Sequence, residues 1–124
     1  MIFLDTHAVV WLYQKELHRF TPRGIDLLEQ EELHVSPMTL LELTYLKEIG
    51  RLRSTAADVF SYLHGATGLT EDHTDFSTIA GHARELTWTR DPFDRIIVAH
   101  AEVIDAPLLT RDETIHASST CAIW

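Results

Sequence analysis

The 124-residue chain is poor in the features that mark several common protein classes. Its single cysteine, Cys121, excludes an internal disulfide and a cysteine-based zinc finger. No apolar run approaches the roughly 20 residues of a membrane-spanning helix. The short apolar segment at residues 1–4 has no basic leader and ends at Asp5, unlike a signal peptide. We therefore expect a cytoplasmic protein with no membrane association.

Basic residues are also few: 10 Lys and Arg stand against 19 Asp and Glu, which gives a net charge of −9. Nucleic-acid binding draws on Lys and Arg contacts to phosphates, so this balance disfavours a broad nucleic-acid surface. Two features would offset it: bound divalent cations, and carboxylates gathered in one place. The same charge could attract a basic protein partner, and charge alone indicates no more than an acidic, soluble surface.

The length suits one compact domain over residues 1–124, and apolar residues make up 45% of it. Short apolar runs predict strands, with a further edge strand at the end of the chain, at residues 1–4, 33–36, 107–110 and 120–124. Capping residues, three of them followed by proline, help to mark the helices predicted at about residues 6–14, 21–31, 36–50, 55–64, 76–86 and 91–104. A single helical turn is predicted at residues 112–116. Short strands that alternate with longer helices indicate an α/β fold with a parallel sheet covered by helices.

Two acidic residues follow predicted strands directly. Asp5 comes immediately after the first apolar run, and Asp112 lies two residues beyond the third. Because parallel strands end at the same edge of a sheet, both carboxylates should project from one rim. Taken alone, Asp5 could be a turn residue and Asp112 a helix cap.

Two further acids lie within apolar helical segments. Apolar residues lie three or four positions away: Met38, Tyr45 and Leu46 for Glu42, and Ile97 and Val98 for Asp94. We therefore expect both carboxylates to point inward, which is costly unless they are paired or bind metal. Taken alone, Glu42 could pair with an arginine and Asp94 could complement a helix dipole. Asp91, which precedes Pro92, is expected to be a helix cap.

The four acids together predict a metal centre made by Asp5, Glu42, Asp94 and Asp112. Two bare carboxylates about 4 Å apart repel by about 4 kcal/mol at an intermediate dielectric, so a cluster requires cations. All-oxygen ligation suits Mg²⁺ or Mn²⁺, which activate water and stabilise phosphoryl charge. The eight histidines form no pair with the spacing of a metalloprotease site, so zinc is disfavoured.

Several other polar residues flank the predicted centre. The hydroxyls of Thr6, Ser36 and Thr110 could orient the carboxylates or a bound water, although capping explains Thr6 and Ser36 equally well. Arg95 and Arg111 adjoin the acids and are candidates for contacts with substrate phosphates. Structural or solvent-exposed ion pairs explain these two arginines equally well.

The chain resembles the PIN-domain family, especially the VapC-type toxins of toxin–antitoxin pairs. The resemblance spans nearly the whole chain and rests on FLDTHAVVWL at residues 3–12, Val35-Ser36 with Glu42, DPFDRIIVAHA at residues 91–101, and LLTRDETI at residues 108–115. It implies a three-layer α/β/α sandwich with a short parallel sheet, and a Mg²⁺- or Mn²⁺-dependent endoribonuclease. Asp5, Glu42, Asp94 and Asp112 match the family's acidic quartet, and Thr110 matches the small hydroxyl residue before the last acid. Pro37 departs from many relatives but fits a helix start.

The resemblance also implies partners. Toxins of this type act on RNA, form homodimers and are held inactive by a cognate antitoxin, whose basic tail would suit the acidic charge found here. A catalytically silent PIN-like binding module remains an alternative. Two other families with acidic α/β sites fit less well: a haloacid-dehalogenase-like phosphatase requires an aspartate where His7 stands, and a response-regulator receiver requires an acid after the second strand.

Overall fold

A computed structural model describes all residues, 1–124, and shows a sheet of five parallel strands in the order β3-β2-β1-β4-β5. The strands are short, and β1 lies in the middle. In chain order they are β1 (Ile2–Leu4), β2 (Leu33–Val35), β3 (Thr70–Glu71), β4 (Leu108–Leu109) and β5 (Ala122–Ile123). The predicted parallel sheet is therefore confirmed, including β5 as an edge strand beside β4.

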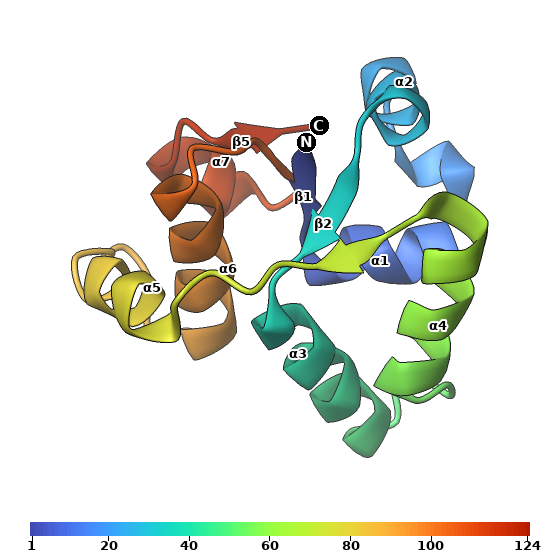
Figure 1. The fold of residues 1–124 in the computed structure, drawn as a ribbon, viewed down its shortest axis with the longest axis horizontal. Coiled ribbons are helices and arrows are strands. Elements are labelled where there is room, and N and C mark those ends of the chain that lie inside the picture. The colour runs from blue at the N-terminus through green and yellow to red at the C-terminus, as the bar shows by residue number, and fades with distance from the viewer.

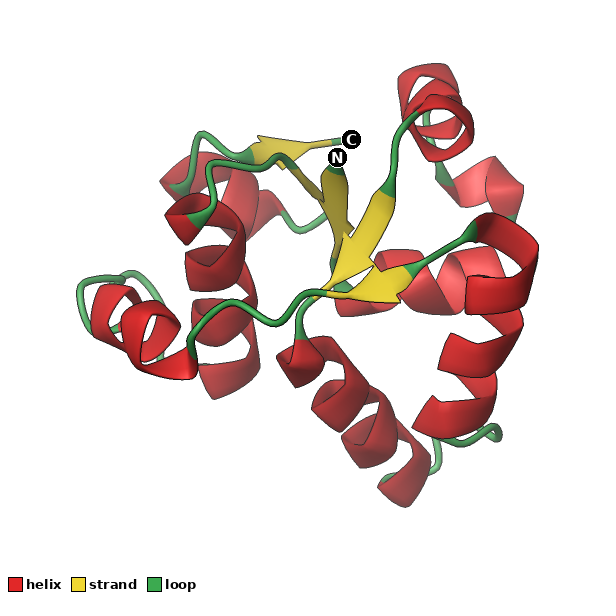
Figure 2. Cartoon of the chain, in the orientation of Figure 1, coloured by secondary structure: helices red, strands yellow, loops and turns green.

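Helices cover both faces of the sheet, which makes the three-layer α/β/α sandwich (Figures 1 and 2). In the view of Figure 1, α5, α6 and α7 lie to the left of the strands, and α1 and α4 lie to the right. The helices are α1 (Thr6–Tyr13), α2 (Pro22–Gln30), α3 (Pro37–Glu48), α4 (Ala56–Thr67), α5 (Phe76–Ala83), α6 (Pro92–Val103) and α7 (Glu113–Ser118), with a 3₁₀ turn η1 (Leu17–Arg19). None of these helices combines the length and hydrophobicity that a bilayer span requires.

The alternation of side chains along β1 separates two hydrophobic clusters. Ile2 and Leu4 face one cluster, which includes residues of α1, α3 and α4, whereas Phe3 faces the other, which includes residues of α6 and α7. All three side chains are at most 1% exposed. Because β1 is buried on both sides, it reads as a continuous apolar run rather than an alternating one.

The strand order reverses direction at β1. From β1 the chain moves outward to β2 and β3, then crosses to the opposite side of β1 and continues through β4 to β5. In open parallel sheets, the carboxyl ends of the two strands that flank such a reversal leave a crevice between the helices that follow them. Here those strands are β1 and β4, which pair through Phe3 with Leu108 and Leu4 with Leu109.

Side-chain caps define the helix starts that the sequence predicts. The side chains of Thr21, Ser36, Thr55 and Asp91 each accept a backbone N–H at the start of α2, α3, α4 and α6. α4 ends at Gly68, whose φ of 75° is a left-handed conformation that glycine adopts without strain.

The structure differs from the prediction mainly at four places. One is α4, which runs on to Thr67, three residues beyond its expected end. β3 was not predicted, because a two-residue strand at the sheet edge has no hydrophobic signal of its own. η1 was also not predicted. α5 ends at Ala83, three residues before the expected end, and Arg84 caps it.

Candidate active site

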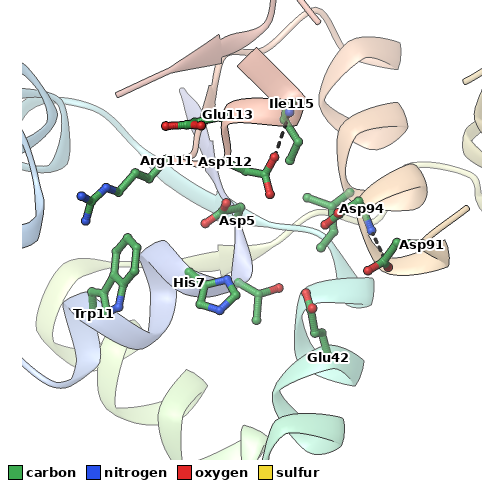
Figure 3. Close-up of a pocket in the computed structure, with 12 residues that line it drawn as sticks. Asp5, His7, Trp11, Glu42, Asp91, Asp94, Arg111, Asp112, Glu113 and Ile115 are labelled. Atoms are coloured by element: carbon green, nitrogen blue, oxygen red, sulfur yellow. Dashed lines mark hydrogen bonds between the residues drawn. The ribbon is translucent and has the colours of Figure 1, made fainter. Parts of the chain in front are cut away.

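A cavity of about 540 Å³ opens at the carboxyl ends of β1 and β4, at the crevice described above. Its walls come from α1, α3, α6 and the loop that leads from β4 to α7. Acidic side chains dominate the lining: they are Asp5, Glu42, Asp91, Asp94, Asp112 and Glu113. Figure 3 shows Asp5, Glu42, Asp94 and Asp112 directed toward a common space. The four acids that the sequence singled out are therefore brought together in one cavity.

Asp5 lies at the floor of the cavity and is 8% exposed. Its Oδ1 accepts the backbone N–H of Ala8 at 2.8 Å, which caps α1, and its Oδ2 accepts the hydroxyl of Thr110. Burial raises the pKa of Asp5, and the charge of Asp112 adds to that rise, whereas the two hydrogen bonds oppose it. Each carboxylate oxygen has two lone pairs, so capping leaves both oxygens able to accept a further ligand.

Asp112 is an exposed residue, and it caps α7 while facing the same cavity. Its Oδ1 accepts the backbone N–H of Ile115 at 2.9 Å. Asp91 caps α6 in the same way, through Phe93 at 2.8 Å and Asp94 at 3.3 Å. The capping roles considered for both residues are therefore real, but they do not remove the carboxylates from the cavity.

Glu42 lines the cavity from α3, but it does not lie at the centre of the buried face of that helix. The buried face of α3 carries Thr39, Leu43 and Leu46, whereas Tyr45 is 45% exposed. Glu42 thus lies half-buried at the margin of the apolar face rather than at its centre. It points into the cavity, as the sequence predicts, although Tyr45 does not lie on the buried face. Burial raises the pKa of Glu42, and the charges of nearby acids add to the rise.

Asp94 is the least compensated of the acids. It is half-buried in the first turn of α6 and accepts no hydrogen bond or ion pair from a side chain. Burial raises the pKa of Asp94 to about 7, and the carboxylates that add to the rise are Asp91, Asp112, Glu42 and Asp5. Mutual repulsion of this kind is what a bound cation would relieve.

Three helices begin at the cavity wall, each with an acid at its start. Asp5 caps α1, Asp91 caps α6 and Asp112 caps α7. The positive ends of the helix dipoles stabilise nearby negative charge by about 0.3–1 kcal/mol each. This is less than the repulsion between close carboxylates, so the dipoles reduce the excess negative potential without cancelling it.

Two polar groups bear on whether a divalent cation fits the cavity. The hydroxyl of Thr6 lines it and is buried, and it lies close enough to Glu42 to lower the pKa of that carboxylate without forming a well-aligned hydrogen bond. A bound water or ligand would complete its hydrogen bonding. The only basic side chains in the wall are His7 and Arg111. The other polar atoms around the four acids are carboxylate and hydroxyl oxygens. Oxygen ligands of this kind are those that Mg²⁺ and Mn²⁺ prefer.

The side chains do not, however, form a closed cage. No group of three or more His, Cys, Asp or Glu side chains is close enough, as they stand, to hold one metal ion. Mg²⁺ usually keeps several waters and binds through one or two carboxylates together with substrate phosphates. An open arrangement of carboxylates around a 540 Å³ cavity is compatible with that mode of binding.

The three predicted supporting hydroxyls have different positions. Thr110 is fully buried; it donates to Asp5 and accepts the backbone N–H of Asp112 at 3.1 Å, so it links two of the acids. Thr6 lines the cavity, as described above. Ser36 does not line it: its hydroxyl accepts the backbone N–H of Met38 at 3.2 Å and caps α3.

Of the two arginines predicted to contact phosphates, only Arg111 lines the cavity. Arg111 lines the cavity and is exposed. Arg95 is turned away, because the next position on a helix is rotated by about 100° from Asp94. Its guanidinium donates to the carbonyls of Ala83 at 3.2 Å and Arg84 at 3.3 Å. Arg95 therefore satisfies the C-terminal end of α5, and its assignment as a phosphate contact is corrected.

Several cavity residues were not predicted as site residues, namely His7, Trp11 and Glu113. His7 and Trp11 are four residues apart on α1, and their rings lie 5.8 Å apart. The position of His7, two residues beyond Asp5 at the start of a helix, was the available signal. Glu113 follows Asp112 directly, and acids at a helix start are common, so the sequence alone gives no signal that marks it as a site residue.

Comparisons with known proteins return one family and a set of similar structures. A family model described as PIN domain matches residues 2–118. Ten solved chains match this one. One is the structure of VapBC2 from Rickettsia felis bound to a DNA fragment from their promoter, with a TM-score of 0.68 and 17% identity over 99% of this chain and 96% of that one. At that identity the likeness concerns the fold alone. No match was found among curated proteins.

Proposed function

The chain belongs to the PIN-domain family, and from that premise we propose that it is a Mg²⁺- or Mn²⁺-dependent endoribonuclease, the VapC-type toxin of a toxin–antitoxin pair. The observation that carries the proposal is the meeting of Asp5, Glu42, Asp94 and Asp112 around one cavity at the end of the sheet. These four residues come from α3, α6 and the ends of β1 and β4, which are far apart in the sequence. No single structural role explains all four positions.

The proposed roles divide between the acids and the groups beside them. Asp5, Glu42, Asp94 and Asp112 would hold the divalent ions, and Thr110 would keep Asp5 oriented through its hydrogen bond. When bound, the ions would supply Lewis acidity, activate water and neutralise charge on the phosphoryl oxygens. Because no three acids yet stand at ligating distance, ion binding would require small rotations of the exposed side chains.

The acidic side chains alone cannot bind an RNA phosphate, since like charges repel. Bound divalent cations would reduce the negative potential at this point and could coordinate phosphate oxygens directly, and Arg111 adds a positive charge at the wall. Cation-dependent RNA binding would therefore be local to the cavity, which reconciles the proposal with a net charge of −9. By family resemblance, the products would be a 5′-phosphate and a 3′-hydroxyl.

The partner proposals rest on the family and on the one similar complex. VapBC2 from Rickettsia felis was solved as a toxin–antitoxin assembly on a DNA fragment, and its fold matches this chain over 99% of its length. We accordingly propose a cognate antitoxin for this chain, a homodimer, and a cytoplasmic location. The chain would act as one nuclease domain.

A catalytically silent binding module is the competing function. It would share the fold and could share the antitoxin-like partner. The uncompensated Asp94, with its pKa raised to about 7, favours the enzyme, because a protein that only binds a partner gains nothing from unrelieved repulsion.

The deciding experiment is cleavage of bulk tRNA by the purified chain with Mg²⁺ or Mn²⁺, with EDTA, and by Asp5→Asn. The matched control is Glu113→Gln, which removes an acid from the same cavity wall but outside the quartet. We expect cleavage with metal, none with EDTA, and at least about a hundredfold loss for Asp5→Asn. Cleavage at the wild-type rate by a folded Asp5→Asn protein would show that the assigned centre is wrong.

A further inference from the structure

A second cavity adjoins the acidic one and has the opposite charge. It has a volume of about 560 Å³, and it is lined by His18, Arg19, Phe20, Thr21, Arg111 and Trp124. No acidic side chain lines it, whereas six line the first cavity. On a chain with 10 Lys and Arg, the placement of two arginines and a histidine around one groove is a local reversal of the overall charge.

Arg111 joins the two cavities, since it lines both. It sits in the loop between β4 and α7, directly before Asp112. In Figure 3 its guanidinium points away from Asp5 and Asp94, toward the side on which Trp11 lies. No hydrogen bond or ion pair to another side chain holds it there. The route out of the acidic cavity on this side therefore passes a free positive charge.

Arg19, the last residue of η1, adds a second positive charge to the groove. Its guanidinium carbon lies 5.2 Å from the centre of the Trp11 ring, a cation–π contact that fixes its position. Trp11 itself lines the acidic cavity, so Arg19 lies on the other side of a shared wall. The Nε of Arg19 forms an ion pair with Glu16 Oε1 at 3.4 Å, but this buried nitrogen makes no hydrogen bond. The side chain is 39% exposed, so the guanidinium remains available to a ligand.

Aromatic rings pack against one another in the wall beneath these cations. The rings of Phe20 and Trp124 stack at 4.9 Å, and Trp124 meets Trp11 edge-on at 5.7 Å. Packing of this kind favours a preformed groove, which lowers the ordering cost of binding. The tryptophans pack against one another rather than presenting open faces, so the argument for a ligand rests on the cations.

We propose that this groove, through Arg19, His18 and Arg111, binds the phosphates of the RNA strand that flank the scissile phosphate. The inference rests on the proposed function. It specifies the path of the RNA strand, which leaves the acidic cavity past Arg111 and over the edge of Trp11. The groove itself has no acidic lining residue, so its exposed cations match a phosphate backbone even though Arg19 pairs with Glu16 at its edge. The continuity of the two cavities puts the flanking phosphates here. Recognition of this kind is independent of base sequence.

The test compares two substrates: a dinucleoside monophosphate, which has only the scissile phosphate, and a single-stranded oligoribonucleotide of about twelve nucleotides. The variants are Arg19→Gln, Arg111→Gln and the double variant. Arg19→Lys keeps the charge, and Arg51→Gln is the control, since Arg51 is exposed, bears the same charge and lines neither cavity. Thermal unfolding establishes that each variant is folded.

We expect Arg19→Gln to raise KM for the longer RNA about three- to fivefold with little change in kcat. The ratio of kcat/KM between the longer and the shorter substrate should fall by the same factor. Arg19→Lys should recover most of the loss, and Arg51→Gln should match wild type. Each phosphate contact to single-stranded nucleic acid contributes about 0.7 to the slope of log affinity against log salt, so the double variant should lose about 1.4 of that slope.

The outcomes separate this inference from the proposed function. If wild type cleaves RNA while the ratio and the salt slope of the double variant are unchanged, the groove does not bind the strand and the inference is overturned. If no RNA is cleaved, fluorescence anisotropy of the labelled oligomer decides: binding that depends on Arg19 supports the groove, and binding that does not overturns it. If a deca-glutamate peptide binds through Arg19 more tightly than the oligomer, the groove serves an acidic protein segment and the inference is wrong.

Discussion

The hydroxyl of Thr110 donates to Oδ2 of Asp5 across 105 residues of sequence. Both groups are buried, and they stand at the carboxyl ends of β4 and β1, which are adjacent in the sheet. The same Thr110 oxygen accepts the backbone N–H of Asp112. One small side chain therefore sets the relative positions of two acids in the candidate active site.

Thr110→Val should weaken metal binding without removing any carboxylate. Valine has nearly the same shape but leaves buried Oδ2 of Asp5 without its donor, which costs about 1–3 kcal/mol of stability. Losing such a supporting hydrogen bond typically lowers metal affinity about 10- to 100-fold. A Mn²⁺ titration of activity measures the half-saturating concentration, and Thr110→Ser, which keeps the hydroxyl, is the control. A wild-type Mn²⁺ requirement in Thr110→Val would show that this hydrogen bond does not position Asp5.

Divalent cations should stabilise the folded chain, because they relieve the repulsion that raises the pKa of Asp94 to about 7. At a free ion concentration one hundred times Kd, a single site adds about 2.7 kcal/mol. Thermal unfolding with Mg²⁺, Mn²⁺ or EDTA measures the change in Tm.

Asp94→Asn provides the companion measurement. In EDTA this variant should be more stable than wild type, because a repelling charge is gone, but it should gain less from added metal. Glu113→Gln, on the rim of the same cavity, should respond to metal as wild type does. A Tm of wild type that is indifferent to all divalent ions would contradict the metal centre.

Arg95→Gln should affect stability and leave RNA cleavage intact. The change removes hydrogen bonds to the carbonyls of Ala83 and Arg84, which should cost about 1 kcal/mol. Urea unfolding gives the stability, and kcat/KM for RNA gives the activity. Arg111→Gln is the natural comparison, since it lines the cavity. A loss of kcat/KM in folded Arg95→Gln as large as in Arg111→Gln would return Arg95 to the list of phosphate contacts.

The hydrogen-bonded pair of Asp72 and His100 should make the free energy of unfolding depend on pH in the acidic range. Burial would raise the pKa of Asp72, but hydrogen bonds from Thr74 and His100 outweigh it and lower the pKa to about 2. The Nε2 of fully buried His100 lies 2.7 Å from Asp72 Oδ1. A carboxylate with a lowered pKa stabilises the fold above its unfolded value of 3.8, and the stabilisation is lost as the pH falls through about 2.

Asp72→Asn should therefore be less stable than wild type by about 1 kcal/mol near pH 6, after allowance for partial exposure, and the difference should shrink toward pH 2. Urea unfolding at several pH values measures this. Asp26→Asn, an exposed position with no hydrogen bond or ion pair, should show no such trend. A difference between Asp72→Asn and wild type that stays constant from pH 6 to pH 2 would disprove the assigned role of the charge.

The local sequence pattern predicted which residues form the site better than it predicted how their side chains are oriented. Asp5 and Asp112 follow apolar strands, and strand direction alone places them at one rim. Glu42 was correctly assigned to the cavity, but through a helix face that the structure shows to be partly exposed, since Tyr45 packs beside Phe93 at 5.6 Å rather than in the core. Helical periodicity identifies a face to within a residue or so, and a side chain at its margin can belong to either side.

Arg95 and Arg111 illustrate the same limit. Both adjoin an acid in the sequence, yet only Arg111 reaches the cavity. The difference arises because Arg95 is on a helix, where one step turns the side chain by about 100°, and α5 offers it free carbonyls. Arg111 is in a loop, where no such rotation applies.

Local chemistry in the chain was sufficient to determine the parallel α/β architecture, the helix caps and the identity of the four acids, because these depend on residue type and short-range spacing. Tertiary packing alone decided that Arg111 would join the acidic cavity to a basic groove built by Arg19 and Trp124. Those three residues come from η1, a loop and the end of β5, and their proximity depends on how a reversal of strand order at β1 brings distant segments together. The spacing of these residues in the sequence does not predict that they lie close together. They are brought together when helices pack on both faces of the sheet and bury it.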